Sequence, residues 1–148
     1  PMMYCTFKSI DKTLVPNVIA NDTLDSLTIT ALGTDSIILN NEKKVHKVML
    51  PLRYTSDSTI FILRYDPVRN WDNADTLYIV QQNTPYFQSM ECGYMMKQNI
   101  ISAKFGNKRN SAETIDSIYL RNKEANTNEI ENLQIFYRYR DRTPPTIE

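Results

Sequence analysis

The sequence predicts an all-β protein, an antiparallel β-sandwich of about eight strands with immunoglobulin-like or related Greek-key topology. Three observations lead to this fold class. Residues that favour strands, above all Ile, Val, Thr and Tyr, are plentiful and Ala is sparse. Apolar residues recur at every second position over short segments. Turn-forming residues separate these segments at intervals of about 10–15 residues, which is typical of successive short strands.

The expected strands follow from this alternation in chain order. Apolar and polar residues alternate in 27–31 and again in 46–52, which is typical of strands with one face in a core. Segments 60–65 and 77–80 are apolar at nearly every position, and they predict strands that are covered on both faces. The remaining expected strands are 94–105 and 133–139.

Residues 111–120 are ambiguous from their pattern alone. Ile115, Ile118 and Tyr119 fit the period of a helix. Ile115, Ser117 and Tyr119 fit the period of a strand equally well. The residues themselves therefore leave both interpretations open.

The length of the chain predicts one domain over residues 1–142 and a disordered tail over 143–148. The 17 Lys and Arg residues balance the 17 Asp and Glu residues, so the chain lacks the surplus of cations that nucleic-acid binding requires. We therefore expect no nucleic-acid partner. No apolar run approaches the roughly 20 residues of a membrane-spanning helix, so we expect no transmembrane segment.

The sequence offers few residues for catalysis or metal binding. His46 is the only histidine, and its place at the start of an alternating segment predicts packing at a rim rather than general-base chemistry. One His and two distant Cys do not supply the ligands of common zinc sites. Asp66, Asp72 and Asp75 offer oxygen ligands for calcium without the spacing of an EF-hand loop, and we interpret them as a solvated loop. We expect no metal, no cofactor and no enzymatic activity.

Aromatic residues in polar surroundings are the candidates for binding. Trp71 lies in a polar segment with Tyr65 and Arg69 nearby, where its ring would be free to stack on a sugar. The alternative is that Trp71 closes one end of the sandwich. Tyr86 and Phe87 form the second candidate group.

The two cysteines, Cys5 and Cys92, lie too far apart in the sequence for a CxxC motif. We expect them to form a disulfide that joins the N-terminal segment to the middle of the chain. This expectation rests on the first residue, Pro1, which points to removal of an upstream segment during export. The alternative is two buried free thiols that pack as small apolar residues.

The most specific segment of the chain is Pro85-Tyr86-Phe87-Gln88-Ser89-Met90-Glu91-Cys92-Gly93. Weaker strand-and-turn motifs extend from about Leu24 to Tyr137, among them Leu32-Gly33-Thr34-Asp35-Ser36, Leu50-Pro51-Leu52 and Ile115-Asp116-Ser117-Ile118. In these motifs the sequence resembles an uncharacterised family of small exported proteins, often predicted lipoproteins, from Bacteroides-type bacteria. The resemblance implies a periplasmic or outer-membrane-associated chain with a lipid anchor upstream. It also implies that residues 114–120 form a strand, and it supplies no activity.

The sequence thus predicts a noncatalytic domain of the cell envelope that has a structural role or binds a protein or glycan partner. One alternative is an envelope hydrolase with a pair of carboxylates, such as Glu91 with Asp116, which requires both groups in one cleft. Another alternative is a secreted inhibitor or assembly subunit that pairs through an exposed strand edge.

Overall fold

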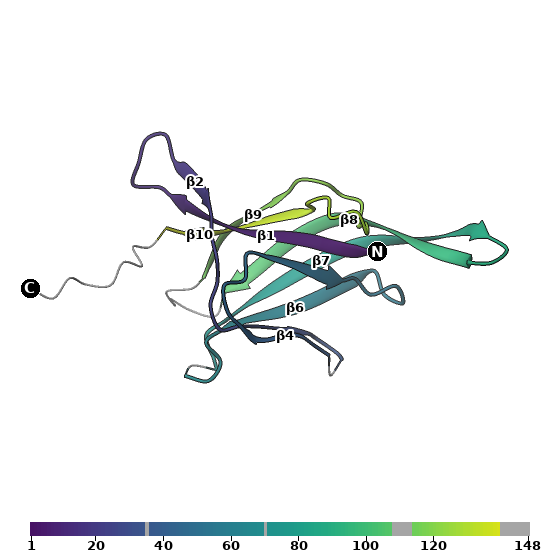
Figure 1. Cartoon of the computed structure of the whole chain (residues 1–148), viewed down its shortest axis with the longest axis horizontal. Coiled ribbons are helices and arrows are strands. Elements are labelled where there is room, and N and C mark those ends of the chain that lie inside the picture. The colour runs from purple at the N-terminus through teal and green to yellow at the C-terminus, as the bar shows by residue number, and fades with distance from the viewer. Residues whose placement is uncertain (35, 70, 108–113, 140–148) are drawn as a thin grey trace, which may run out of the picture.

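The computed structural model describes residues 1–34, 36–69, 71–107 and 114–139, and these residues form ten strands and no helix (Figure 1). The all-β prediction is therefore confirmed, with more strands than the roughly eight expected. The strands are β1 (Met2–Asp11), β2 (Val18–Asn21), β3 (Leu27–Ala31), β4 (Ile37–Glu42), β5 (Lys47–Pro51), β6 (Ser58–Tyr65), β7 (Ala74–Ser89), β8 (Gly93–Asn107), β9 (Ile115–Leu120) and β10 (Leu133–Arg138).

The strands form two five-stranded sheets, as a β-sandwich requires. One sheet has the order β2-β1-β10-β9, with β5 also paired to β1, and the other has the order β4-β3-β6-β7-β8. The strands β1 and β10 run parallel, with Cys5 beside Leu133, whereas the other described pairings are antiparallel. The first half of β1 pairs with β5 and its second half with β2. The antiparallel character of the predicted sandwich therefore holds, apart from one pair.

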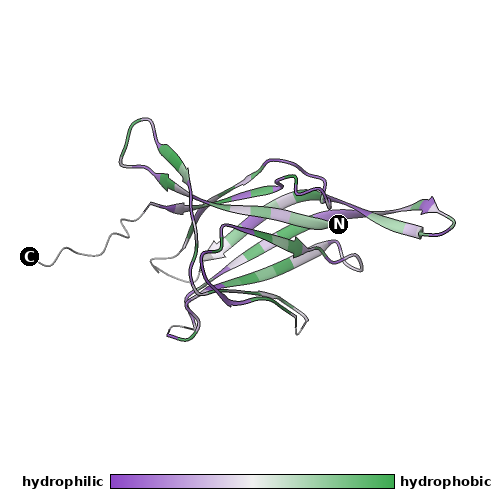
Figure 2. Ribbon diagram, viewed as in Figure 1, coloured by the Kyte–Doolittle hydropathy of each residue, from purple (hydrophilic) through white to green (hydrophobic). Residues whose placement is uncertain are grey.

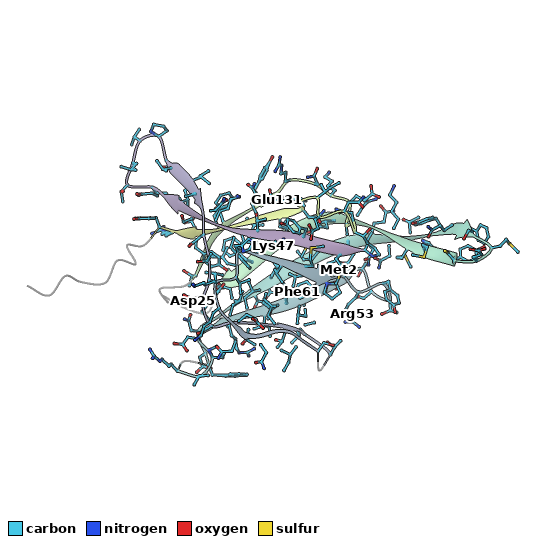
Figure 3. The ribbon with its side chains drawn as sticks, in the orientation of Figure 1. Met2, Asp25, Lys47, Arg53, Phe61 and Glu131 are labelled. Carbon is cyan, nitrogen blue, oxygen red and sulfur yellow. The ribbon has the colours of Figure 1, made fainter. Side chains whose placement is uncertain are left out.

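Side chains of alternating strand residues fill the space between the sheets. Met3, Cys5 and Phe7 point inward from β1. Leu63 and Phe61, the latter labelled in Figure 3, point inward from β6. All five are at most 1% exposed. Apolar segments accordingly run along both sheets in Figure 2. The period-two alternation read from the sequence is thus the alternation between core and surface.

The hairpin of β7 and β8 is longer than the sandwich and projects from one end of it (Figure 1). Leu77 and Ile79 in β7 are fully buried, whereas the residues that follow Asn83 are mostly exposed. We call residues 82–98 the arm. Gly93 follows the turn of the arm and begins β8, and its φ of 67° lies in the left-handed region that glycine adopts most easily.

The ambiguous segment before residue 120 forms the strand β9, as the family resemblance implies, and not a helix. The expected tail, 143–148, lies outside the described residues. No helix that is long and apolar enough to cross a bilayer occurs in the part of the chain that the structure describes.

The predicted disulfide is not formed, because Cys5 and Cys92 are both free thiols. Cys5 is buried in the centre of β1, and this burial, with a smaller effect of Glu131, raises the pKa of its thiol. Cys92 is exposed in the turn of the arm. The arm carries Cys92 out of the sandwich, and a disulfide needs Cα atoms within about 7 Å. The alternative of buried thiols describes Cys5 alone.

Candidate functional site

The arm presents an apolar surface to solvent. Within residues 82–98 only Glu91 and Lys97 carry a charge. Met90 at the turn is 92% exposed. The other exposed large apolar side chains of the arm are Tyr86 at 45%, Phe87 at 53%, Tyr94 at 76% and Met95 at 39%. Contiguous apolar surface of this kind marks interaction sites on soluble domains.

Both faces of the arm carry these side chains, because cross-strand partners share a face. Phe87 is opposite Tyr94, and the two rings meet edge to face with centroids 5.5 Å apart. Pro85 and Met96 continue this face toward the sandwich. Tyr86 and Met95 pair on the opposite face. The arm is therefore a two-stranded ribbon with apolar residues on both sides.

Buried amides fasten the base of the arm to the loop between β5 and β6. Gln81 donates from Nε2 to the carbonyl oxygens of Arg53 at 2.7 Å and Ser56 at 3.0 Å. Asn83 donates to Ser56 at 2.7 Å, and Gln98 donates to the Oδ1 of Asn83 at 2.9 Å. Gln81 and Gln98 are at most 2% exposed, whereas Asn83 is partly exposed, so the bonds are partly shielded from water. The network holds the arm in a fixed direction relative to the sandwich.

The candidate group of Tyr65, Arg69 and Trp71 lies at the other end of the sandwich, at the end of β6 and in the loop between β6 and β7. Trp71 is 61% exposed, and the guanidinium carbon of Arg64 lies 4.0 Å from its ring centroid, so one face of the indole is already covered. The exposed Arg69 forms an ion pair with Asp66 at 3.8 Å. Tyr65 is 2% exposed and belongs to the core. Trp71 and Arg69 are therefore exposed whereas Tyr65 is buried, so the three do not form one surface. All three lie far from Tyr86 and Phe87, which belong to the arm at the opposite end of β7.

A buried polar cluster joins the two sheets at that end, and sequence reasoning missed it. The hydroxyl of Tyr65 donates to Oδ2 of Asp75 at 2.6 Å and lies 2.9 Å from the hydroxyl of Tyr137. The backbone N–H of Ile115 also donates to this Oδ2, at 2.8 Å. Asp75 is 0% exposed. The solvated loop expected at Asp75 is therefore wrong at that residue, which belongs to β7 and faces inward with Leu77.

Burial raises the pKa of Asp75 to about 6, although the hydrogen bonds from Tyr65 and Ile115 act in the opposite direction. Its second carboxylate oxygen, Oδ1, has no hydrogen-bond partner among the described residues. The cluster lines neither of the two grooves described below. We interpret it as a structural link between the sheets.

The carboxylate pair of the hydrolase alternative is not assembled. Glu91 is exposed in the turn of the arm. Asp116 follows Ile115, whose N–H bonds to Asp75 at the opposite end of β7. At about 3.3 Å per residue, β7 spans about 45 Å between Asp75 and the turn. One cleft cannot hold both carboxylates.

Asp116 instead forms ion pairs with Lys12 at 3.0 Å and with Arg138 at 3.2 Å. Its partial burial alone would raise the pKa, but the bonds to Lys12 and Arg138 outweigh that effect and lower the pKa. His46 is exposed just before β5. The described residues contain no group of three or more His, Cys, Asp or Glu side chains placed to hold a metal ion.

A groove of about 660 Å³ accompanies the arm on the side of β8. Its walls are Tyr86, Met95 and Met96 from the arm and the segment 124–128 from the connection between β9 and β10. A second groove, of about 890 Å³, lies at the base of the arm between Tyr54 and Ile101. The arm and the groove beside β8 form the candidate binding site.

Comparison with known proteins gives a family and no activity. Neither the curated proteins nor the solved structures contain a significant match to the chain. Residues 26–137, about three quarters of the chain and including the whole arm, match the "Family of unknown function (DUF6452)". The chain therefore belongs to the DUF6452 family.

Proposed function

We propose that this chain is a noncatalytic binding domain of the cell envelope, and that the arm engages a protein partner. The observation that carries the proposal is the arm itself: a rigidly based ribbon that bears exposed apolar side chains on both faces. Placement in the periplasm or at the outer membrane, with a lipid anchor upstream, rests on the resemblance to small exported proteins.

The chemistry of the arm favours a protein partner over a glycan. Sugar binding combines an aromatic face with several polar groups that bond hydroxyls, whereas the tip of the arm combines Phe87 and Tyr94 with Met90 and Met95. Methionine side chains are flexible and adapt to irregular apolar surfaces of proteins. Aromatic and Met side chains are also enriched in the cores of protein interfaces. The exposed Trp71 offers a sugar only one open face, since Arg64 covers the other.

The exposed side chains of the arm lie outside the buried core, which favours a binding role over a structural one. Burying them would stabilise a complex by roughly 25 cal/mol per Å² of apolar area. The alternative of a secreted inhibitor or assembly subunit also fits this role, because either one binds another protein.

The test is site-specific photo-crosslinking in cells that naturally make the protein. A photoreactive amino acid replaces Met90 in the turn of the arm, and the matched control carries it at Val68, which is 81% exposed in the loop at the other end. We expect a discrete crosslinked product from position 90 and none from position 68. Equal crosslinking at both positions, or none at either, would contradict binding through the arm. Fractionation of the same cells tests the envelope location, and a cytoplasmic pool alone would contradict it.

A further inference from the structure

The edge of β8 that faces away from β7 is partly occupied within this chain. The N–H of Ile100 donates to the carbonyl of Lys123 at 2.7 Å, and the N–H of Ala125 donates to the carbonyl of Gln98 at 2.9 Å. Residues 123–125 therefore lie along this edge like a short added strand. Beyond them the chain turns to the other sheet, where Asn126 and Met2 exchange two backbone hydrogen bonds of 3.1 Å.

The same edge continues along the arm without a partner in the described part of the chain. In an antiparallel pair, residues alternate between those that bond their cross-strand partner and those that turn N–H and C=O outward. Because Gln98 and Ile100 turn outward, Met96 and Tyr94 also turn outward. No described backbone group bonds them. The groove of about 660 Å³ lies beside this free edge, with Met96 on one side and Ala125 on the other.

The opposite edge of the arm is interrupted by a proline, although Phe87, the cross-strand partner of Tyr94, also turns outward there. Pro85 is the cross-strand partner of Met96, so its nitrogen occupies the outward position on β7. Proline has no N–H to offer, and prolines at such positions discourage strand addition. The arm is thus closed to pairing at Pro85 and open at Tyr94 and Met96.

We infer that the free edge of β8 at Tyr94 and Met96 binds an extended segment of the partner protein as an added strand, continuing the row that residues 123–125 begin. The inference rests on the proposed function and specifies how the arm recognises its partner. The edge from Gly93 to Lys97 is about 17 Å long at 3.4 Å per residue, which suits a segment of about five residues.

The side chains beside the edge define the chemistry of that segment. Tyr94 and Met96 lie on one face and Met95 on the other, so neighbouring residues of the added strand meet apolar side chains on both faces. We therefore expect the partner segment to be apolar on both faces. We also expect it to contain no proline, because each of its outward N–H groups has to bond the edge of β8. A second copy of this chain fits less well. If Tyr94 paired with residue 96 of a copy, residue 92 of that copy would oppose Gln98, whose outward carbonyl Ala125 already occupies.

The test uses defined peptides and one pair of variants. Ten-residue peptides are selected from a random display library on the full chain, and the enriched peptides are synthesised as probes. Met96→Pro removes the outward N–H without removing a bond between β7 and β8, and Met96→Ala is the control that removes only the side chain. We expect Met96→Pro to weaken peptide binding at least about tenfold and Met96→Ala to weaken it by less than about threefold. Equal binding by Met96→Pro, or a library that yields no binder, would overturn the inference.

A measurement on the unmodified chain does not depend on the folding of a variant. Bound peptide should slow hydrogen exchange of the Tyr94 and Met96 amides at least about tenfold, and unchanged exchange would overturn the inference. Peptide-free dimers that protect the same amides would identify a second copy as the occupant and also overturn it. If Met96→Pro loses the peptide but keeps the crosslink from position 90, partner binding by the arm survives and only strand addition fails. Absence of the crosslink from position 90 in the protein that keeps Met96 refutes the proposed function itself.

Discussion

The buried carboxyl group of Asp75 should make the stability of this protein depend on pH in an unusual direction. Most paired carboxylates stabilise a fold when they are charged. Asp75 is 0% exposed, and its burial raises the pKa to about 6 from an ordinary value of 3.8. As pH falls from 7 toward 4, the folded protein therefore takes up a proton that the unfolded chain does not yet hold. Because only the folded state binds this proton, the free energy of unfolding rises as the pH falls.

The size of the effect follows from the two pKa values. Each pH unit between them corresponds to about 1.4 kcal/mol, so a difference of about two gives about 3 kcal/mol, fully present below pH 4 and lost as pH rises through 6. Asp116 acts in the opposite sense, because its lowered pKa stabilises the charged form above the ordinary value. Its contribution is lost below about pH 4, outside the window in which Asp75 titrates.

Asp75→Asn isolates the contribution of this group. The amide oxygen retains an acceptor for Tyr65 and Ile115, and the side chain no longer titrates. Urea unfolding followed by far-ultraviolet circular dichroism at intervals from pH 4.5 to 8 gives the free energy of unfolding of both proteins. We expect the unmodified protein to gain about 2–3 kcal/mol relative to Asp75→Asn between pH 7.5 and 4.5. A difference that does not change with pH would refute the reasoning.

Three further predictions concern the fold and the arm. Asn132→Ala should lower the free energy of unfolding by about 3 kcal/mol, because the buried Asn132 side chain accepts one hydrogen bond from the backbone and donates two to it. Chemical denaturation measures this loss, and a loss below about 1 kcal/mol would contradict the prediction. A thiol reagent should modify Cys92 in the native protein and Cys5 only after unfolding; two thiols with equal rates would contradict the burial of Cys5. Gly93→Ala should lower the free energy of unfolding by about 1 kcal/mol through backbone strain alone, because a Cβ there meets no atom within 4 Å. A much larger loss of stability in urea unfolding would show that the turn packs against other residues.

Much of the fold could be predicted because burial and alternation coincide. The segment 27–31 alternates in the sequence and forms β3. The segment 60–65 is apolar at nearly every position and forms β6, in which alternate residues are fully buried. The strand β2 could not be predicted in this way. Its four residues are all exposed, and it forms because β1 offers an edge, which is a tertiary cause with no local pattern.

The candidate site shows the same limit. The sequence predicts that Tyr86 and Phe87 are candidates for binding and that 94–105 is a strand, but alternation cannot tell where a strand leaves its sandwich. Asp75 did carry a signal, because it falls in the period-two series of Leu77 and Ile79. The disulfide was wrong for a related reason: nothing in the spacing of two cysteines shows that one of them ends an arm.

In the proposed function the sandwich supplies stability and the arm serves recognition, and shortening the arm tests this division most directly. Thr84 and Lys97 bond each other across the hairpin by the alternation described above, so an Asn-Gly turn in place of residues 85–96 joins them with suitable geometry. The measurement is the free energy of unfolding of this variant. We predict a value within about 1 kcal/mol of that of the unmodified protein. A loss above about 3 kcal/mol would show that the arm belongs to the stabilising core and would contradict the account.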